Sequence, residues 1–386
     1  MFFSLIPPGF ALYVPAWWGL RFFVVGFGVP GPLTSIFFTV NGCVDHACLD
    51  GNVGVGALVV HDEVGRERRA WLMRSHGVLS FVVVAMIVSA AGPLEGQRAR
   101  QGLLSLEDTR LFYEVIGTGA PIVIVHGGPG LDHSYLQPGM DVLAARNTLI
   151  YYDQRGTGRS DAELDSSVVN LDAFVDDIDV LRQVLDYEKI TVLTHSFATL
   201  IGIEYARRYG DNLTALILMN PSEPGTRFAD QTRTRQAAVT TEEDQLEMQE
   251  LAATEAFSAR DAATLSQVYR VTFRSAFRDR SRIDELEMDL SERTAKNGQA
   301  VARLLGESLG MTDGAVNWWD RLADISAPTL VLHGRYDIPP VAMAQALSDA
   351  LPSGSLVVLN SGHFPYIEDA GGLTSAIVSF LGALPR

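Results

Sequence analysis

Cysteine is nearly absent from this 386-residue chain, and both cysteines, Cys43 and Cys48, lie among its first fifty residues. The rest of the chain therefore has no disulfide framework, no thiolate nucleophile and no cysteine-based metal site. Low-complexity runs are also missing, and the contents of apolar residues (47%) and charged residues (20%) are those of a globular protein. Basic residues are outnumbered, which gives a formal net charge of −16. This acidic balance argues against nucleic acids and anionic membrane surfaces as partners.

A long unbroken apolar run is lacking as well. Residues 1–40 are apolar but are interrupted by prolines and by Arg21, so they fit a membrane-spanning helix poorly. Residues 73–92 contain the three parts of a secretory signal peptide, namely a short basic start at Met73, an apolar run and an exit of small residues. We therefore expect export to the periplasm or the exterior, with residues 1–72 a spurious or disordered upstream extension. The alternative is that residues 73–92 are retained as a membrane anchor.

From about residue 102, apolar segments typical of buried strands alternate with helical patterns. Residues 221–319 interrupt this alternation, because they are charged, helix-prone and free of strand patterns. We predict an α/β fold in which residues 102–220 and 320–386 form a mostly parallel sheet flanked by helices. Residues 221–319 would be a helical cap inserted after the sixth strand. One amphipathic helix is predicted over residues 171–185, with four acidic residues on its polar side: Asp172, Asp176, Asp177 and Asp179.

Ser196 lies between a predicted buried strand, residues 190–193, and a predicted helix, residues 197–209. A serine at such a corner is held clear of its backbone, next to free N–H groups at the start of a helix. The arrangement is similar to the nucleophile elbow G-x-S-x-G, although Thr194 and Ala198 replace the outer glycines. Threonine is β-branched, so we expect it to strain the turn or shift the serine. A plain helix-capping serine is the alternative interpretation.

Two further polar groups follow later strands. Asp337 comes after the strand predicted at residues 328–332, and His363 comes after the strand predicted at residues 355–359. The carboxyl ends of parallel strands meet at one edge of a sheet, so Ser196, Asp337 and His363 should lie together there. In that arrangement the histidine takes the serine proton and the aspartate orients the histidine. Glu223 follows the preceding strand and is the alternative acid.

Five motifs give the chain from about residue 103 onwards a clear family resemblance. It resembles α/β-hydrolases of the proline iminopeptidase-like group, which implies an aminopeptidase acting through an acyl-serine on small or short-peptide substrates, with Ser196 as nucleophile, His363 as base and Asp337 as its orienting acid. The resemblance assigns the oxyanion hole to the backbone N–H groups of Gly128 and Phe197. Serine at the elbow argues against haloalkane or epoxide chemistry. The motifs are HGGPG (126–130), DQRGTGRS (153–160), the elbow, LHGRYD (332–337) and SGHFPY (361–366).

Substrate class stays open between a peptidase, an esterase and a catalytically weak binding protein of the same fold. Iminopeptidases of this family present cap carboxylates to the free amine of the substrate. The candidates for substrate contact here are Glu223, Glu242 and Glu243, with Trp318 as a pocket wall. No G-K-[ST] follows the glycines of residues 156–158, which argues against nucleotide binding. We expect no cofactor and no metal.

The remaining polar groups in these motifs are expected to be structural. His126 should shape the glycine loop, His333 should pack at a strand end, and His195 should form a wall of the elbow. Asp153 and Arg155 should form an ion pair or loop hydrogen bonds that hold the following glycine turns.

Overall fold

The computed structural model describes residues 99–310 and 317–384, together with six short strands in the leading segment. The chain divides into two units, residues 1–94 and 95–386. In the first unit the six strands form three separate antiparallel pairs. They are β1 (Leu12–Pro15) with β2 (Arg21–Val24), β3 (Phe38–Thr39) with β6 (Asn52–Val53), and β4 (Gly42–Val44) with β5 (Ala47–Leu49).

The predicted signal segment, residues 73–92, lies outside the described residues, so export and the upstream extension remain predictions. Among the residues that are described, none of the helices has the length and apolar character needed to cross a membrane.

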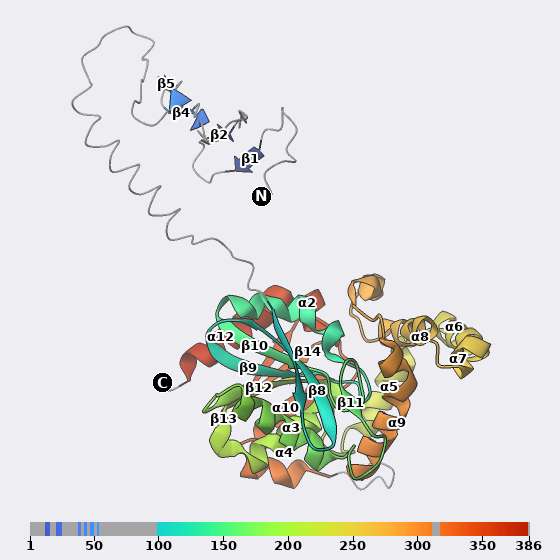
Figure 1. Cartoon of the computed structure of the whole chain (residues 1–386). Helices are drawn as coiled ribbons and strands as arrows, with labels where there is room; N and C mark the ends of the chain where they lie inside the picture. The colour runs from blue at the N-terminus through green and yellow to red at the C-terminus, as the bar shows by residue number, and fades with distance from the viewer. Residues whose placement is uncertain are drawn as a thin grey trace. The chain divides into compact units, whose positions relative to one another are not determined.

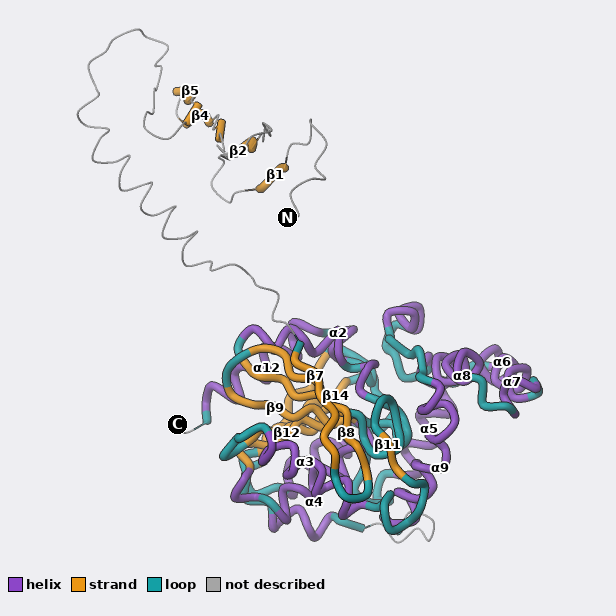
Figure 2. The backbone as a smooth tube through the Cα atoms, viewed as in Figure 1, coloured by secondary structure: helices purple, strands orange, loops and turns teal. Residues whose placement is uncertain are grey.

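A mixed sheet organises the second unit, with helices on both of its faces (Figures 1 and 2). Its order in the described chain is β11-β8-β10-β9-β12-β13-β14-β15, with β7 paired to β8. From β10 to β15 every neighbouring pair is parallel, whereas β8 is antiparallel to its neighbours. The mostly parallel sheet is therefore confirmed. The strands are β7 (Arg100–Ser105), β8 (Thr109–Gly117), β9 (Ala120–Val125), β10 (Asn147–Tyr152), β11 (Asp161–Ala162), β12 (Ile190–His195), β13 (Leu213–Met219), β14 (Thr329–Gly334) and β15 (Gly354–Leu359).

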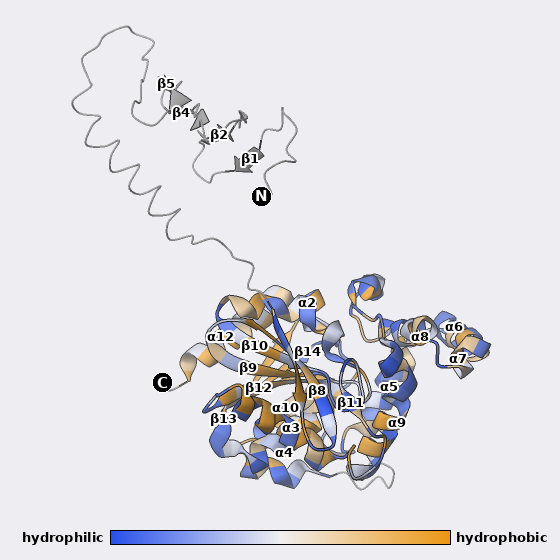
Figure 3. Ribbon diagram, in the orientation of Figure 1, coloured by the Kyte–Doolittle hydropathy of each residue, from blue (hydrophilic) through white to orange (hydrophobic). Residues whose placement is uncertain are grey.

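Alternate residues of each strand supply two hydrophobic layers, because successive side chains point to opposite faces of a sheet. On β9, Val123 and Val125 pack with one layer and Ile122 and Ile124 with the other. Figure 3 shows the resulting concentration of hydrophobic residues in the central strands. The first layer is covered by α3 (Leu171–Val184), α4 (Thr199–Arg208) and α10 (Val341–Ala350), and the second by α2 (Gln137–Met140) and α12 (Ala370–Ala383); α11 (Pro365–Glu368) precedes α12.

The segment between β13 and β14 corresponds to the predicted cap, and its described residues form helices joined by loops and turns, without a strand. It follows the sixth long strand of the sheet, since β11 is a two-residue strand that the sequence pattern did not predict. Helices α6 to α8 project away from the sheet (Figure 1), whereas α9 packs onto the core through Val301 and Leu304. The cap helices are α5 (Ala229–Val239), α6 (Glu242–Ala252), α7 (Glu255–Ser258), α8 (Ala262–Arg274) and α9 (Glu292–Ser308).

The polar side predicted for α3 is only partly correct. Asp177 and Asp179 are buried rather than exposed to solvent. Asp177 receives a bidentate ion pair from Arg155, with nitrogen–oxygen distances of 2.7 and 2.8 Å. Asp179 accepts hydrogen bonds from Arg182 and Asn212. Buried carboxylates need such partners, and Arg155 and Asn212 come from other parts of the chain that helical periodicity does not reveal.

Candidate active site

Ser196 occupies a strained corner between β12 and α4. Its φ angle is +56°, in the left-handed region that residues other than glycine rarely adopt. The carbonyl of Ser196 accepts hydrogen bonds from the Thr199 hydroxyl at 2.7 Å and from the Ser222 amide at 3.1 Å. A short 3₁₀ turn, Ser196–Ala198, leads directly into α4. These bonds hold the turn, and the hydroxyl of Ser196 is left at the carboxyl edge of the sheet.

Thr194, which replaces the first elbow glycine, is accommodated by a glycine on the opposing helix. A Cβ atom added to Gly202 of α4 would lie only 2.6 Å from Cγ2 of Thr194. The methyl group therefore occupies space that Gly202 leaves open, and the strand and helix remain in close contact. The expected displacement of Ser196 is not seen: its hydroxyl lies within hydrogen-bonding distance of His363.

Ser196, His363 and Asp337 form a continuous hydrogen-bonded chain. The Ser196 Oγ lies 2.9 Å from Nε2 of His363, and Nδ1 of His363 lies 3.0 Å from both carboxylate oxygens of Asp337. An ionised Asp337 carboxylate can only accept hydrogen bonds, so the imidazole of His363 carries its proton on Nδ1. Nε2 is then free to accept the serine proton. Asp337 is fully buried, whereas the His363 side chain is 13% exposed. The arrangement can move a proton from the serine to the imidazole.

Asn220 supports the carboxylate, although it was not among the predicted site residues. Its Nδ2 donates to Oδ2 of Asp337 at 2.7 Å and to the carbonyl of Gly362 at 3.0 Å. The amide of Ile338 donates to Oδ1 of Asp337 at 2.7 Å. Burial acts to raise the pKa of Asp337, but the charge and hydrogen bond of His363 outweigh it and lower that pKa to about 2. The only sequence signal for Asn220 is a polar residue directly after buried β13.

The glycine loop after β9 lies against the elbow. A Cβ atom on Gly127 would lie 2.4 Å from the His195 carbonyl and 2.9 Å from Cβ of Ser196, so only glycine allows this approach. Gly128 has a φ angle of +55°. Among the described residues, the backbone N–H groups of Gly128 and Phe197 donate to no protein acceptor. Both remain available to an anionic oxygen formed beside Ser196.

The other candidate substrate contacts are placed differently. Glu223 receives hydrogen bonds from the Phe228 amide at 2.9 and 3.0 Å, which closes its own loop. Glu242 and Glu243 are exposed in the first turn of α6, within the projecting part of the cap. Trp318 is buried in the first hydrophobic layer. The structure therefore brings together Ser196, Asp337 and His363 without Glu242 and Glu243.

The remaining motif residues hold the loops around the site. His126 accepts from the Gln154 amide at 3.1 Å, and burial lowers its pKa. His333 donates to the Pro339 carbonyl at 2.9 Å. Asp153 and Arg155 do not pair with each other. Asp153 binds Nδ1 of His133 at 2.5 Å and the Arg159 amide at 2.7 Å.

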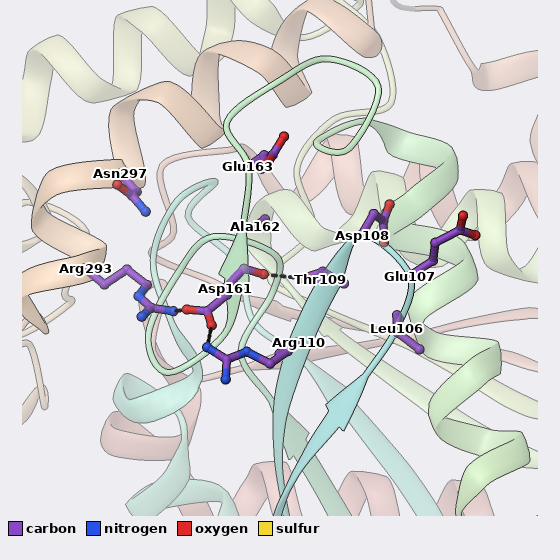
Figure 4. Close-up of a pocket in the computed structure, with 10 residues that line it drawn as sticks. All are labelled: Leu106, Glu107, Asp108, Thr109, Arg110, Asp161, Ala162, Glu163, Arg293 and Asn297. Carbon is purple, nitrogen blue, oxygen red and sulfur yellow. Dashed lines mark hydrogen bonds and ion pairs between the residues drawn. The ribbon is translucent and has the colours of Figure 1, made fainter.

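A polar surface pocket of about 560 Å³ lies between the β7–β8 turn and α9, and none of the three residues of the hydrogen-bonded chain lines it. The carboxylate of Asp161 lies between Arg110 and Arg293 and binds both (Figure 4). One carboxylate between two guanidinium groups leaves a single net positive charge among these three side chains. Across the described residues, no three histidine, cysteine, aspartate or glutamate side chains are grouped to hold a metal ion.

The architecture and the strand-end residues define a member of the α/β-hydrolases. Residues 120–370 match the model of the alpha/beta hydrolase fold family, and the chain belongs to that family. Among its relatives, a proline iminopeptidase of Heyndrickxia coagulans is 26% identical over 295 residues, covering 74% of this chain and 99% of the relative. The AB hydrolase superfamily protein YisY of Bacillus subtilis is 30% identical, covering 71% and 96%. The solved structure of a thermophilic esterase from Thermogutta terrifontis is 26% identical, with a TM-score of 0.52 and coverage of 74% and 98%.

Proposed function

We propose that this protein is a serine hydrolase that cleaves small ester or peptide substrates through an acyl-enzyme on Ser196. The hydrogen-bonded chain from the Ser196 hydroxyl through His363 to buried Asp337 is the observation that supports it. His363 takes the proton as Ser196 attacks the substrate carbonyl, and then gives it to the leaving group. The N–H groups of Gly128 and Phe197 stabilise the oxyanion, each by about 3 kcal/mol. Water activated by His363 then releases the acyl group.

A fluorophosphonate probe tests this assignment without knowledge of the substrate. It reacts with an activated serine and forms a stable phosphonyl-enzyme. We expect the wild-type protein to be labelled at Ser196 and the Ser196→Ala variant to remain unlabelled while its circular dichroism spectrum is unchanged. Absence of labelling in folded wild-type protein would instead favour the binding protein of the same fold.

For the substrate we propose release of N-terminal proline or small residues from short peptides. The support is the match to proline iminopeptidases over nearly their full length. Such an enzyme needs to recognise a free amine. The rate with L-prolyl-β-naphthylamide should therefore fall about a hundredfold or more when the amine is acetylated, since a desolvated ion pair is lost. Equal rates with both compounds would exclude amine recognition.

An esterase is the second candidate, and the pairing of the acidic side chains favours it. Glu223 is bonded within its own loop, and Asp244 forms ion pairs with Arg274 and Arg280. The charge of Asp244 is already neutralised and the carboxylate of Glu223 is already hydrogen-bonded, which reduces their capacity to bind an ammonium group. The similarity to the Thermogutta terrifontis esterase supports the same alternative. Hydrolysis of p-nitrophenyl esters by wild type but not by Ser196→Ala, without activity on either naphthylamide, would select it.

For localisation we propose export directed by residues 73–92. N-terminal sequencing of the native protein tests this, and a mature terminus near residue 92 is expected. A peptide from residues 1–72 in the native protein would contradict it.

A further inference from the structure

We infer that Tyr135 and His195 are positioning residues that connect the oxyanion loop to the catalytic histidine. This inference rests on the proposed serine hydrolase activity. Neither side chain touches the reacting atoms in the proposed mechanism. Instead, three consecutive hydrogen bonds link the residue before the oxyanion donor Gly128 to the backbone of His363.

The three bonds have only one consistent set of donors. The amide of Gly127 donates to the hydroxyl oxygen of Tyr135 at 2.8 Å. The same hydroxyl lies 2.8 Å from Nδ1 of His195, and Nε2 of His195 lies 3.0 Å from the carbonyl of His363. A carbonyl can only accept, so Nε2 carries the proton of His195 and Nδ1 accepts from the tyrosine. Every polar atom in this series is then satisfied.

His195 stays neutral in this position, which preserves that direction. Burial lowers its pKa, as does the nearby charge of His363, to about 3. A second proton on Nδ1 would oppose the tyrosine hydrogen. It would also place a cation beside the ring of His363, whose centroid is 4.8 Å from that of His195. Between about pH 5 and pH 9 the series therefore keeps one arrangement.

The position of His195 in the chain explains what the bonds accomplish. His195 immediately precedes Ser196, so its bond to the His363 carbonyl ties the general base to the backbone of the nucleophile. At the other end, the bond to Gly127 holds the peptide immediately before Gly128. One series of side chains thus sets the distance between nucleophile, base and oxyanion donor. A displacement of about 1 Å among such groups costs roughly a hundredfold in rate.

Tyr135→Phe removes the central hydroxyl and nothing else. We expect its second-order rate of labelling by a fluorophosphonate probe to fall about ten- to a hundredfold, because the oxyanion loop and the base lose their common support. Tyr366→Phe is the matched control. The Tyr366 ring lies 6.2 Å from that of His195, and its buried hydroxyl has no hydrogen-bond partner among the described residues. Its labelling rate should equal that of wild type.

Two substitutions of His195 separate the ends of the series. Glutamine can place an amide N–H near the position of Nε2 and keep the bond to His363, whereas asparagine can place an oxygen near Nδ1 and keep the bond to Tyr135. Each should retain more activity than His195→Leu, which keeps neither bond. With a turned-over substrate, kcat should fall while KM changes less than about twofold, because the substrate pocket is untouched.

The outcomes distinguish this inference from the proposed function. Unlabelled wild-type protein would remove the proposed function itself. Labelled wild type together with Tyr135→Phe at the wild-type rate would overturn the inference alone. Equal losses in His195→Gln, His195→Asn and His195→Leu, each in proportion to a lower melting temperature, would reduce both residues to a purely structural role. If Tyr135→Phe does not fold, the His195 variants decide.

Discussion

Replacing Gly202 by alanine should destabilise the protein, because the added methyl would collide with Thr194 across the β12–α4 contact. The new Cβ would lie 2.6 Å from Cγ2 of Thr194, and the optimal separation of two carbons is about 3.5–4.0 Å. Strand and helix would have to move apart by about 1 Å. Overpacking of a buried site costs about 1–3 kcal/mol, and a contact this short belongs at the upper end of that range. Alanine regains about 1 kcal/mol of helix propensity over glycine, which leaves a net loss of about 2 kcal/mol.

Thr194→Ser tests whether the collision with Cγ2 of Thr194 causes this loss of stability. Serine removes Cγ2 but keeps the hydroxyl, which lies 3.5 Å from the Ile217 carbonyl. The nearest atoms to the new Cβ of residue 202 would then be Cδ1 of Leu216 at 3.3 Å and Cβ of residue 194 at 3.6 Å. Thr194→Ser alone should lose about 1 kcal/mol through the void that it leaves. In the double variant the alanine methyl fills that void, so the two changes should compensate by about 2 kcal/mol.

Urea denaturation of the wild type, Gly202→Ala, Thr194→Ser and the double variant, monitored by circular dichroism, measures this coupling. Gly202→Ala alone should lower the melting temperature by about 4–8 °C. Its fluorophosphonate labelling should also slow, because α4 carries the turn on which Ser196 is held, and the double variant should recover most of that rate. Additive free energies, with a coupling below about 0.5 kcal/mol, would refute the proposed compensation between Thr194 and Gly202.

Three further predictions concern the polar groups around the site. Arg155→Met leaves Asp177 buried without its ion pair and should cost about 3–5 kcal/mol in urea denaturation; a loss below about 1 kcal/mol would contradict this account. Burial acts to lower the pKa of His133, but its hydrogen bond to Asp153 outweighs burial and raises that pKa. The stabilisation that protonated His133 contributes is therefore full below pH 6.5 and is lost as the pH rises through the pKa of His133 in the folded protein. His133→Gln should therefore flatten the decline of stability above pH 6.5, and a slope equal to that of wild type would disprove it. Asn220→Gly removes two donors at a φ angle of +47° that glycine accepts readily, so kcat should fall about tenfold or more, whereas wild-type kcat would exclude the orienting role.

The pair of His133 and Asp153 should also make stability depend on pH in the acid range. Burial acts to raise the pKa of Asp153, but the hydrogen bond and charge of His133 lower it overall. Its contribution is therefore present above about pH 3.9 and is lost as pH falls through the lower folded-state value. Asp153→Asn should remove both pH dependences, which distinguishes the pair from any other titrating group.

Much of the candidate site was predictable because strand order and chemistry reinforce each other. Ser196, Asp337 and His363 each follow a buried strand, and the carboxyl ends of parallel strands converge at one edge. The structure brings the three side chains together, and the fold and the family membership inferred from the same motifs are confirmed. Their roles in turnover remain the proposal that labelling of Ser196 tests.

Contacts between distant segments were not predictable. Helical periodicity placed Asp177 on a polar face, but Arg155 from a loop pairs with it in the interior. The replacement of an elbow glycine by Thr194 led us to expect strain in the turn or displacement of Ser196. The sequence did not reveal that Gly202 leaves room for the threonine methyl, because Gly202 belongs to the following helix and only the close approach of helix and strand identifies it.

The alternation of apolar strand segments with helical patterns was enough to predict an α/β sheet with a cap and to place each reactive group at the end of a strand, because those properties depend on neighbouring residues. Only the tertiary structure decided which of the polar groups have partners. It joined Tyr135 to His195 and Asn220 to Asp337, and it left the candidate amine ligands Glu242 and Glu243 in the projecting part of the cap. Hydrogen bonds between side chains depend on distances of a few tenths of an ångström between segments far apart in the chain, and those distances are set by packing.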